Sequence, residues 1–69
     1  MENEYEPYVV RTSWDGIDIN TTTHVHRDDA EREYDERVKH YLNLPDMSLA
    51  EGSCIQLIHG FDIHREYVA

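Results

Sequence analysis

The sequence has 69 residues, 15 of them acidic against 6 basic, which gives a formal net charge of −9 at neutral pH, and it contains one cysteine. A chain this short forms one small domain, residues 1–69, that hides only about 60% of the surface of its unfolded form, and residues 1–6 are expected to fray. The charge repels nucleic-acid backbones and anionic membranes, so direct binding to either is excluded, and the lone cysteine excludes an intramolecular disulfide.

The chain shows no sign of export or of membrane insertion. It has no leader in which charged residues precede an apolar run, and no apolar run approaches the roughly 18 residues needed to span a bilayer. We therefore expect a cytoplasmic protein.

The first predicted element is a β-hairpin that begins at Tyr8. The run WDGI places Asp15 and Gly16 between two segments of alternating polarity, and this pair is favoured in two-residue loops because both positions need positive φ. The loop sets a register in which Trp14 lies opposite Ile17. One face then carries Tyr8, Val10, Thr12, Trp14, Ile17, Ile19, Thr21 and Thr23, and the other carries Val9, Arg11, Ser13, Asp18, Asn20, Thr22 and His24.

A helix follows the hairpin. Asp28 is the predicted N-cap, with Glu31 as its capping-box partner. Acidic residues crowd the first turns and basic residues the later ones, which matches the helix dipole, and Glu33 and Arg37 are spaced to form a pair on the helix. The helix should stop before Pro45. Its apolar positions, at helical spacing, are Ala30, Tyr34, Val38, Tyr41 and Leu42.

The last element is a second hairpin, whose register depends on its loop. A two-residue loop at His59 and Gly60 would separate the apolar residues onto two faces, whereas a three-residue loop from Ile58 to Gly60, with Gly60 left-handed, places them together. We prefer the three-residue loop. It puts Ile55, Leu57, Phe61, Ile63 and Tyr67 on the apolar face and Cys54, Gln56, Asp62, His64 and Glu66 on the polar face.

These elements predict an α+β fold of the form ββαββ, a four-stranded, mostly antiparallel sheet with one helix packed on one face. The connection through the helix would make the second and third strands parallel if they were neighbours, and the strand order is otherwise open. The uncovered face of the sheet must meet water, a second copy or another protein.

Four residues form a candidate metal site. His24 with His26, and Asp62 with His64, project to one side of extended segments, and they could hold Zn²⁺ if the second and fourth strands lay close together. Such spacings are common by chance, and the simpler interpretation is that these are ordinary polar-face residues. A metal-binding or small-ligand-binding module is therefore the alternative function, and no cofactor is expected.

Enzymatic chemistry is not expected from this sequence. None of the serines, nor Cys54, lies on a strand-turn-helix elbow, and the glycines are used in turns and not in a phosphate-binding loop. So short a chain also has little room for the water-excluding pocket that would separate the pKa values of two carboxylates.

The remaining hypothesis is a small acidic interaction protein that docks on a macromolecular partner and modulates or inhibits it. The charge suits a partner with a basic surface, such as the nucleic-acid-binding surface of another protein. A homodimeric subunit of a larger assembly is a further alternative. The candidate contact residues are Trp14, Asp18, Glu31, Asp35, Glu36, Asp62 and Glu66.

In size, charge and absence of catalytic motifs, the chain resembles the small acidic host-takeover and anti-defence proteins that bacterial and archaeal viruses encode. This resemblance is one of type, so it assigns no residue and no target. It implies action in the cytoplasm of a host cell.

Overall fold

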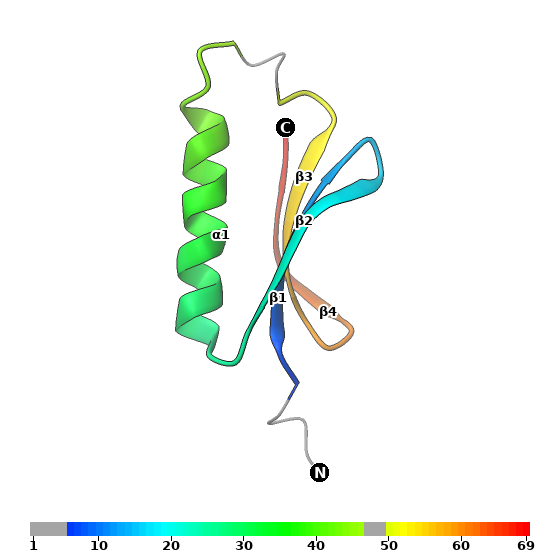
Figure 1. Ribbon diagram of the computed structural model, residues 1–69, viewed down its shortest axis with the longest axis vertical. Helices are drawn as coiled ribbons and strands as arrows, with labels where there is room; N and C mark the ends of the chain where they lie inside the picture. The colour runs from blue at the N-terminus through cyan, green and yellow to red at the C-terminus, as the bar shows by residue number, and fades with distance from the viewer. Residues whose placement is uncertain (1–5, 47–49) are drawn as a thin grey trace.

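The computed structural model describes residues 6–46 and 50–69. The elements follow in the order β1 (Tyr8–Trp14), β2 (Ile17–His24), α1 (Arg27–Leu42), β3 (Ser53–His59) and β4 (Asp62–Val68). All neighbouring strands are antiparallel, in the order β2-β1-β3-β4, and α1 lies across one face of the sheet (Figure 1). The predicted α+β fold is therefore confirmed, and β2 and β3 are not neighbours, so they form no parallel pair.

The hydrophobic core lies between α1 and the two central strands. Val10 of β1 and Ile55 and Leu57 of β3 are completely buried, and Ala30 and Tyr34 of α1 cover them. Tyr8, Val38, Tyr41 and Tyr67 pack around this cluster. No helix in the described parts of the chain is long and apolar enough to cross a membrane.

The helix begins one residue before the predicted N-cap. Its N-cap is His26, which has extended backbone angles (φ −105°, ψ 137°) and makes no side-chain capping hydrogen bond. The prediction of Asp28 as the cap was wrong, because Asp28 lies inside the first turn. Its negative charge there still interacts favourably with the positive end of the helix dipole. Glu31 pairs with Arg27 and Arg65. The helix ends at Leu42, before Pro45, as predicted.

The first hairpin has the predicted loop but a different register beyond it. Asp15 and Gly16 adopt positive φ (53° and 82°), and Trp14 pairs with Ile17. A β-bulge then makes Ile19 an extra residue in β2. Every pair after the bulge is shifted by one, so the predicted faces of this part of β2 were wrong. Thr12 lies opposite Asn20, Val10 opposite Thr22 and Tyr8 opposite His24.

The second hairpin has neither of the loops considered from the sequence. β3 ends at His59 and β4 begins at Asp62, so the loop residues are Gly60, with φ 64°, and Phe61. A bulge makes His64 an extra residue in β4, which places Ile63 opposite Ile58 and Arg65 opposite Leu57. The prediction that Phe61 and Ile63 join the core was therefore wrong: Phe61 is fully exposed and Ile63 is 54% exposed.

The face without the helix carries three rows of side chains across β1, β3 and β4. The row nearest the second hairpin loop is apolar and consists of Val9, Ile58 and Ile63. The next row is Arg11, Gln56 and Glu66, and the last is Ser13, Cys54 and Val68. We call this surface the uncovered face. Cys54, Gln56 and Glu66 lie here as predicted. The prediction that His24, Asp62 and His64 also lie here was wrong, because the bulges and the Gly60–Phe61 loop place them on the side of the sheet that carries Tyr8.

Candidate functional site

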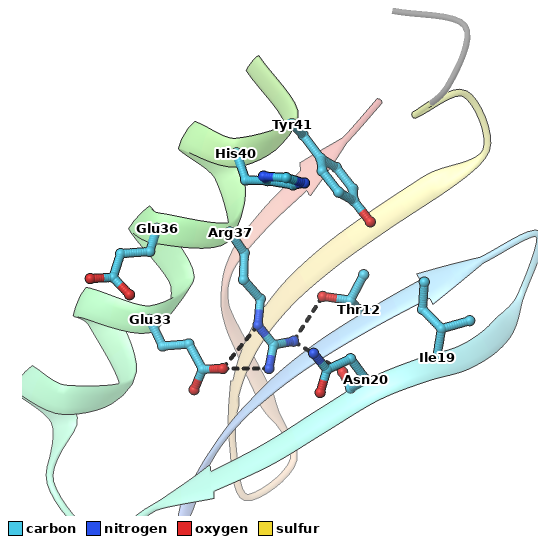
Figure 2. Close-up of a pocket in the computed structure, with 8 residues that line it drawn as sticks. All are labelled: Thr12, Ile19, Asn20, Glu33, Glu36, Arg37, His40 and Tyr41. Atoms are coloured by element: carbon cyan, nitrogen blue, oxygen red, sulfur yellow. Dashed lines mark hydrogen bonds and ion pairs between the residues drawn. The ribbon is translucent and has the colours of Figure 1, made fainter. Parts of the chain in front are cut away.

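A groove lies between α1 and the β1–β2 hairpin. It arises because the tip of this hairpin turns away from the helix (Figure 1). The groove has a volume of about 530 Å³. Ile19 borders it from β2 and Tyr41 borders it from α1 (Figure 2). The full lining is Thr12, Ile19, Asn20, Glu33, Glu36, Arg37, His40 and Tyr41.

Arg37 fixes the base of the groove. Its side chain is only 12% exposed, and its Nη2 donates to Glu33 Oε2 at 2.5 Å and to Thr22 Oγ1 at 3.0 Å. Its Nη1 donates to Thr12 Oγ1 at 2.8 Å and to the Asn20 carbonyl at 3.0 Å. These bonds join α1 to β1 and β2, so this guanidinium is a structural tie and not an available cation.

Glu33 is the acceptor at the centre of this network. Its Oε1 accepts from Thr22 Oγ1 at 2.6 Å and lies 2.5 Å from His24 Nε2, while Oε2 binds Arg37. Burial opposes ionisation of Glu33, but the hydrogen bonds from Thr22, His24 and Arg37 outweigh it and lower the pKa to about 2. The network therefore holds an ionised carboxylate between the helix and the edge strand.

A second, shallower hollow continues the groove toward the start of the helix. It has a volume of about 350 Å³ and is lined by His24, Asp29, Arg32, Glu33 and Glu36. Glu33 and Glu36 line both hollows, so the two hollows are continuous and run along one side of α1, next to β2. We call the combined feature the α1–β2 groove. It is lined by Thr12 on β1, by Ile19, Asn20 and His24 on β2, and by Asp29, Arg32, Glu33, Glu36, Arg37, His40 and Tyr41 on α1.

The structure does not bring the candidate metal ligands together. His24 is in β2 and His64 is in β4, which form opposite edges of the sheet. His26 is exposed at the helix N-cap. Among residues 6–46 and 50–69, no group of three or more His, Cys, Asp and Glu side chains could hold a metal ion.

One ring cluster was not found from the sequence. The rings of Tyr8 and His59 stack with centroids 4.0 Å apart, and the ring of His64 lies 5.7 Å from that of His59. Both predicted loops contain His59, whereas in the structure it is the last residue of β3. The pairing of β1 with β3 puts Tyr8 and His59 directly opposite each other, and no local pattern in the sequence indicates that these two strands are neighbours.

The seven predicted contact residues are distributed over several surfaces. Trp14 is 51% exposed at the first hairpin, where its Nε1 donates to the Glu51 carbonyl at 3.1 Å. Glu36 lines the α1–β2 groove, and Asp62 is exposed beside the second hairpin loop. The other four accept from neighbouring side chains: Asp18 from Arg11, Glu31 and Asp35 from Arg65, and Glu66 from Gln56.

The positive charges of the protein are almost all used internally. Each of the five arginines lies in an ion pair with a carboxylate, which leaves Lys39 as the remaining basic side chain besides histidine. The pairs are Arg11 with Asp18, Arg27 with Glu31, Arg32 with Asp29, Arg37 with Glu33, and Arg65 with Glu31 and Asp35. In the described part of the chain, the carboxylates that lie in none of these pairs include Glu6, Asp15, Asp28, Glu36, Glu51, Asp62 and Glu66.

No protein-family model, curated protein or solved structure matches this chain. The charge distribution and the surfaces of the fold are therefore the observations on which a function rests.

Proposed function

We propose that this is a small acidic, non-enzymatic interaction protein that docks on a basic surface of a macromolecular partner and modulates or inhibits that partner. The single observation that carries the proposal is that every arginine forms an ion pair with a carboxylate of the same chain. Exposed carboxylates of the described residues lie outside these pairs, among them Asp15, Asp28, Glu36, Glu51 and Asp62. Such a surface attracts cationic proteins and accelerates their association.

A nucleic-acid-binding surface is the kind of basic partner surface that such a protein would mask. It carries clustered Lys and Arg side chains that normally contact phosphates. A compact body with excess carboxylates competes for the same side chains. The proposal places this competition in the cytoplasm, and in the host cytoplasm if the protein is of the viral type described above.

The experiment is affinity capture from a cell lysate at low and moderate salt, followed by identification of the retained proteins. We expect basic proteins to be retained at low salt and released as salt rises, because the Debye length falls from about 30 Å at 0.01 M to about 8 Å at 0.15 M. The test variant is Asp28→Asn/Glu36→Gln/Asp62→Asn, in which none of the altered carboxylates pairs with an arginine. We expect this variant to retain less of the basic proteins than the wild type does. Equal retention by this variant, or retention unaffected by salt, would contradict the proposal.

A further inference from the structure

We propose that the outer edge of β2 binds an extended basic segment of the partner as an additional strand, with the side chains of that segment entering the α1–β2 groove. This inference deepens the proposed function and rests on it for the charge of the partner. It adds a location, a binding geometry and a sequence pattern for the segment that binds.

The first observation is the unpaired edge. Among the described strands, β2 pairs only with β1, so its outer main-chain N–H and C=O groups lack strand partners. The Asn20 carbonyl accepts from Arg37 Nη1 at 3.0 Å, which leaves Thr21–His24 as the part of the edge that an added strand would pair with. The stretch Thr21–His24 follows a regular register, and the bulge at Ile19 lies outside it. This stretch contains no proline or lysine, which are residues that natural proteins use to block an exposed edge. An extended peptide can therefore add to it through main-chain hydrogen bonds.

The other edge of the sheet is less suited to the same role. A bulge at His64 interrupts β4 near its middle. Arg65 then carries a positive charge on this side and binds Glu31 and Asp35, each at 3.0 Å. A basic segment would meet both an irregular main chain and carboxylates that already have a cationic partner.

The second observation is the position of the carboxylates beside β2. Asp29, Glu33 and Glu36 follow one side of α1 at helical spacing and line the groove. Glu33 is held by Arg37, but Glu36 is exposed and has no arginine partner in the described chain. The Asp29 side chain is 47% exposed, and its Oδ1 lies 3.4 Å from Arg32 Nη1. Such an exposed ion pair is weak, so a cation of the bound segment can displace Arg32 from Asp29.

The geometry of a strand predicts which residues of the segment matter. Side chains alternate between the two faces of a sheet, so every second residue of the added strand points toward α1. Near His24 those residues meet Asp29 and Glu36, which favours Lys or Arg. Near Ile19 they meet the exposed Ile19 side chain and Tyr41, which favours an apolar residue.

Electrostatics favours a basic partner over a second copy of this chain at the same edge. Pairing of β2 with β2 of another copy would bring together two molecules that each carry a net charge of −9. The repulsion between two such molecules opposes their association, and it is strongest at low salt. A basic segment is instead attracted by the negative charge of the protein.

The test is an NMR titration of the full chain with an extended probe peptide of about eight residues in which Lys alternates with Thr. We expect the amide signals of Thr21–His24 to shift while those of Asp62–Val68 stay in place. Glu36→Gln should weaken binding about threefold, as for an exposed charge contact. Glu51→Gln, which removes the same charge away from the groove, should weaken it less.

Two further probes separate strand addition from simple charge attraction. They are the same peptide with N-methyl groups on its odd-numbered or on its even-numbered residues. Strand addition predicts that one of the two loses binding, because only alternate N–H groups of an added strand face β2. Equal binding of both, or shifts centred on β4, on the uncovered face or on Trp14, would overturn the inference and leave the proposed function intact.

A titration with polylysine at low salt distinguishes failure of the β2 site from failure of the proposed function. If neither the peptide nor polylysine shifts any amide signal, both the inference and the proposed function are overturned. If polylysine binds but the peptide does not, the β2 site alone is overturned. Pairing of two copies through β2 in the free protein, detected by light scattering and by protection of the Thr21–His24 amides, would also overturn it.

Discussion

Glu33 connects three elements through one carboxylate. It accepts from Thr22 and His24 of β2 and from Arg37 of its own helix, and Arg37 reaches onward to Thr12 of β1. The carboxylate stays ionised although it is partly buried, because the donors around it stabilise the charge. Loss of this charge would leave the Arg37 guanidinium desolvated without its counter-ion, which is costly.

Glu33→Gln is therefore expected to lower the free energy of unfolding at neutral pH by about 2 kcal/mol. The pKa of Glu33 falls from an ordinary value of 4.5 to about 2 in the folded protein. Its contribution is thus fully present above pH 4.5 and is lost as the pH falls toward 2. Urea unfolding followed by circular dichroism should show that the gap between wild type and variant closes over this range. Glu51→Gln is the control, and a gap that stays constant with pH would contradict the assignment.

At the scale of elements, local chemistry predicted the loop and the helix but not the bulges. Asp15 and Gly16 satisfy the positive φ of their turn, and Pro45 limits the helix, so both signals lie in adjacent residues. The register of β2 has no comparable signal, because a run of Asn and Thr fits either face of a sheet. Ile19 was assigned to the core on alternation alone, and one inserted residue was enough to change the face of each residue that follows.

The site was predictable only in part for the same reason. Glu33 and Arg37 were recognised as a helical pair, since their spacing is visible in the sequence. Their bonds to Thr12, Asn20, Thr22 and His24 join segments that are far apart in the chain. They depend on the shifted register, so no local pattern could predict them.

The corrected register of the second hairpin leads to a matched comparison of two isoleucines. Ile55 is completely buried between the sheet and α1, whereas Ile63 lies on the uncovered face. Ile55→Ala is expected to lower the free energy of unfolding by about 2 kcal/mol or more, and Ile63→Ala by less than about 1 kcal/mol. Urea denaturation of the two variants checks this. Equal losses would support the three-residue loop predicted from the sequence.

At the scale of the whole molecule, charge and exposed apolar surface act in opposition. The uncovered face presents the row Val9, Ile58 and Ile63, and Phe61 projects from the adjacent loop with its side chain fully exposed. Apolar surface of this kind favours association. At neutral pH the net charge of −9 opposes the approach of a second copy of the chain.

Self-association should therefore depend on pH. Light scattering is expected to give the mass of one chain, 8.2 kDa, at pH 7, and an increasing mass as the pH approaches the isoelectric point near 4.7. The Phe61→Ser/Ile63→Thr variant keeps the same charge and should associate much less. A stable dimer at pH 7 would instead favour the homodimeric alternative, and equal association of wild type and variant at pH 4.7 would exclude this face as its cause.

The strand order also has a consequence for the route by which the chain folds. β1 with β2, and β3 with β4, close through two-residue turns, whereas the β1–β3 ladder joins residues from opposite ends of the sequence. Local hairpins form quickly, and a single long-range ladder then sets the speed of folding. We therefore expect truncation of side chains in that ladder, such as Val10 and Leu57, to slow folding, and truncation in the outer strands mainly to speed unfolding.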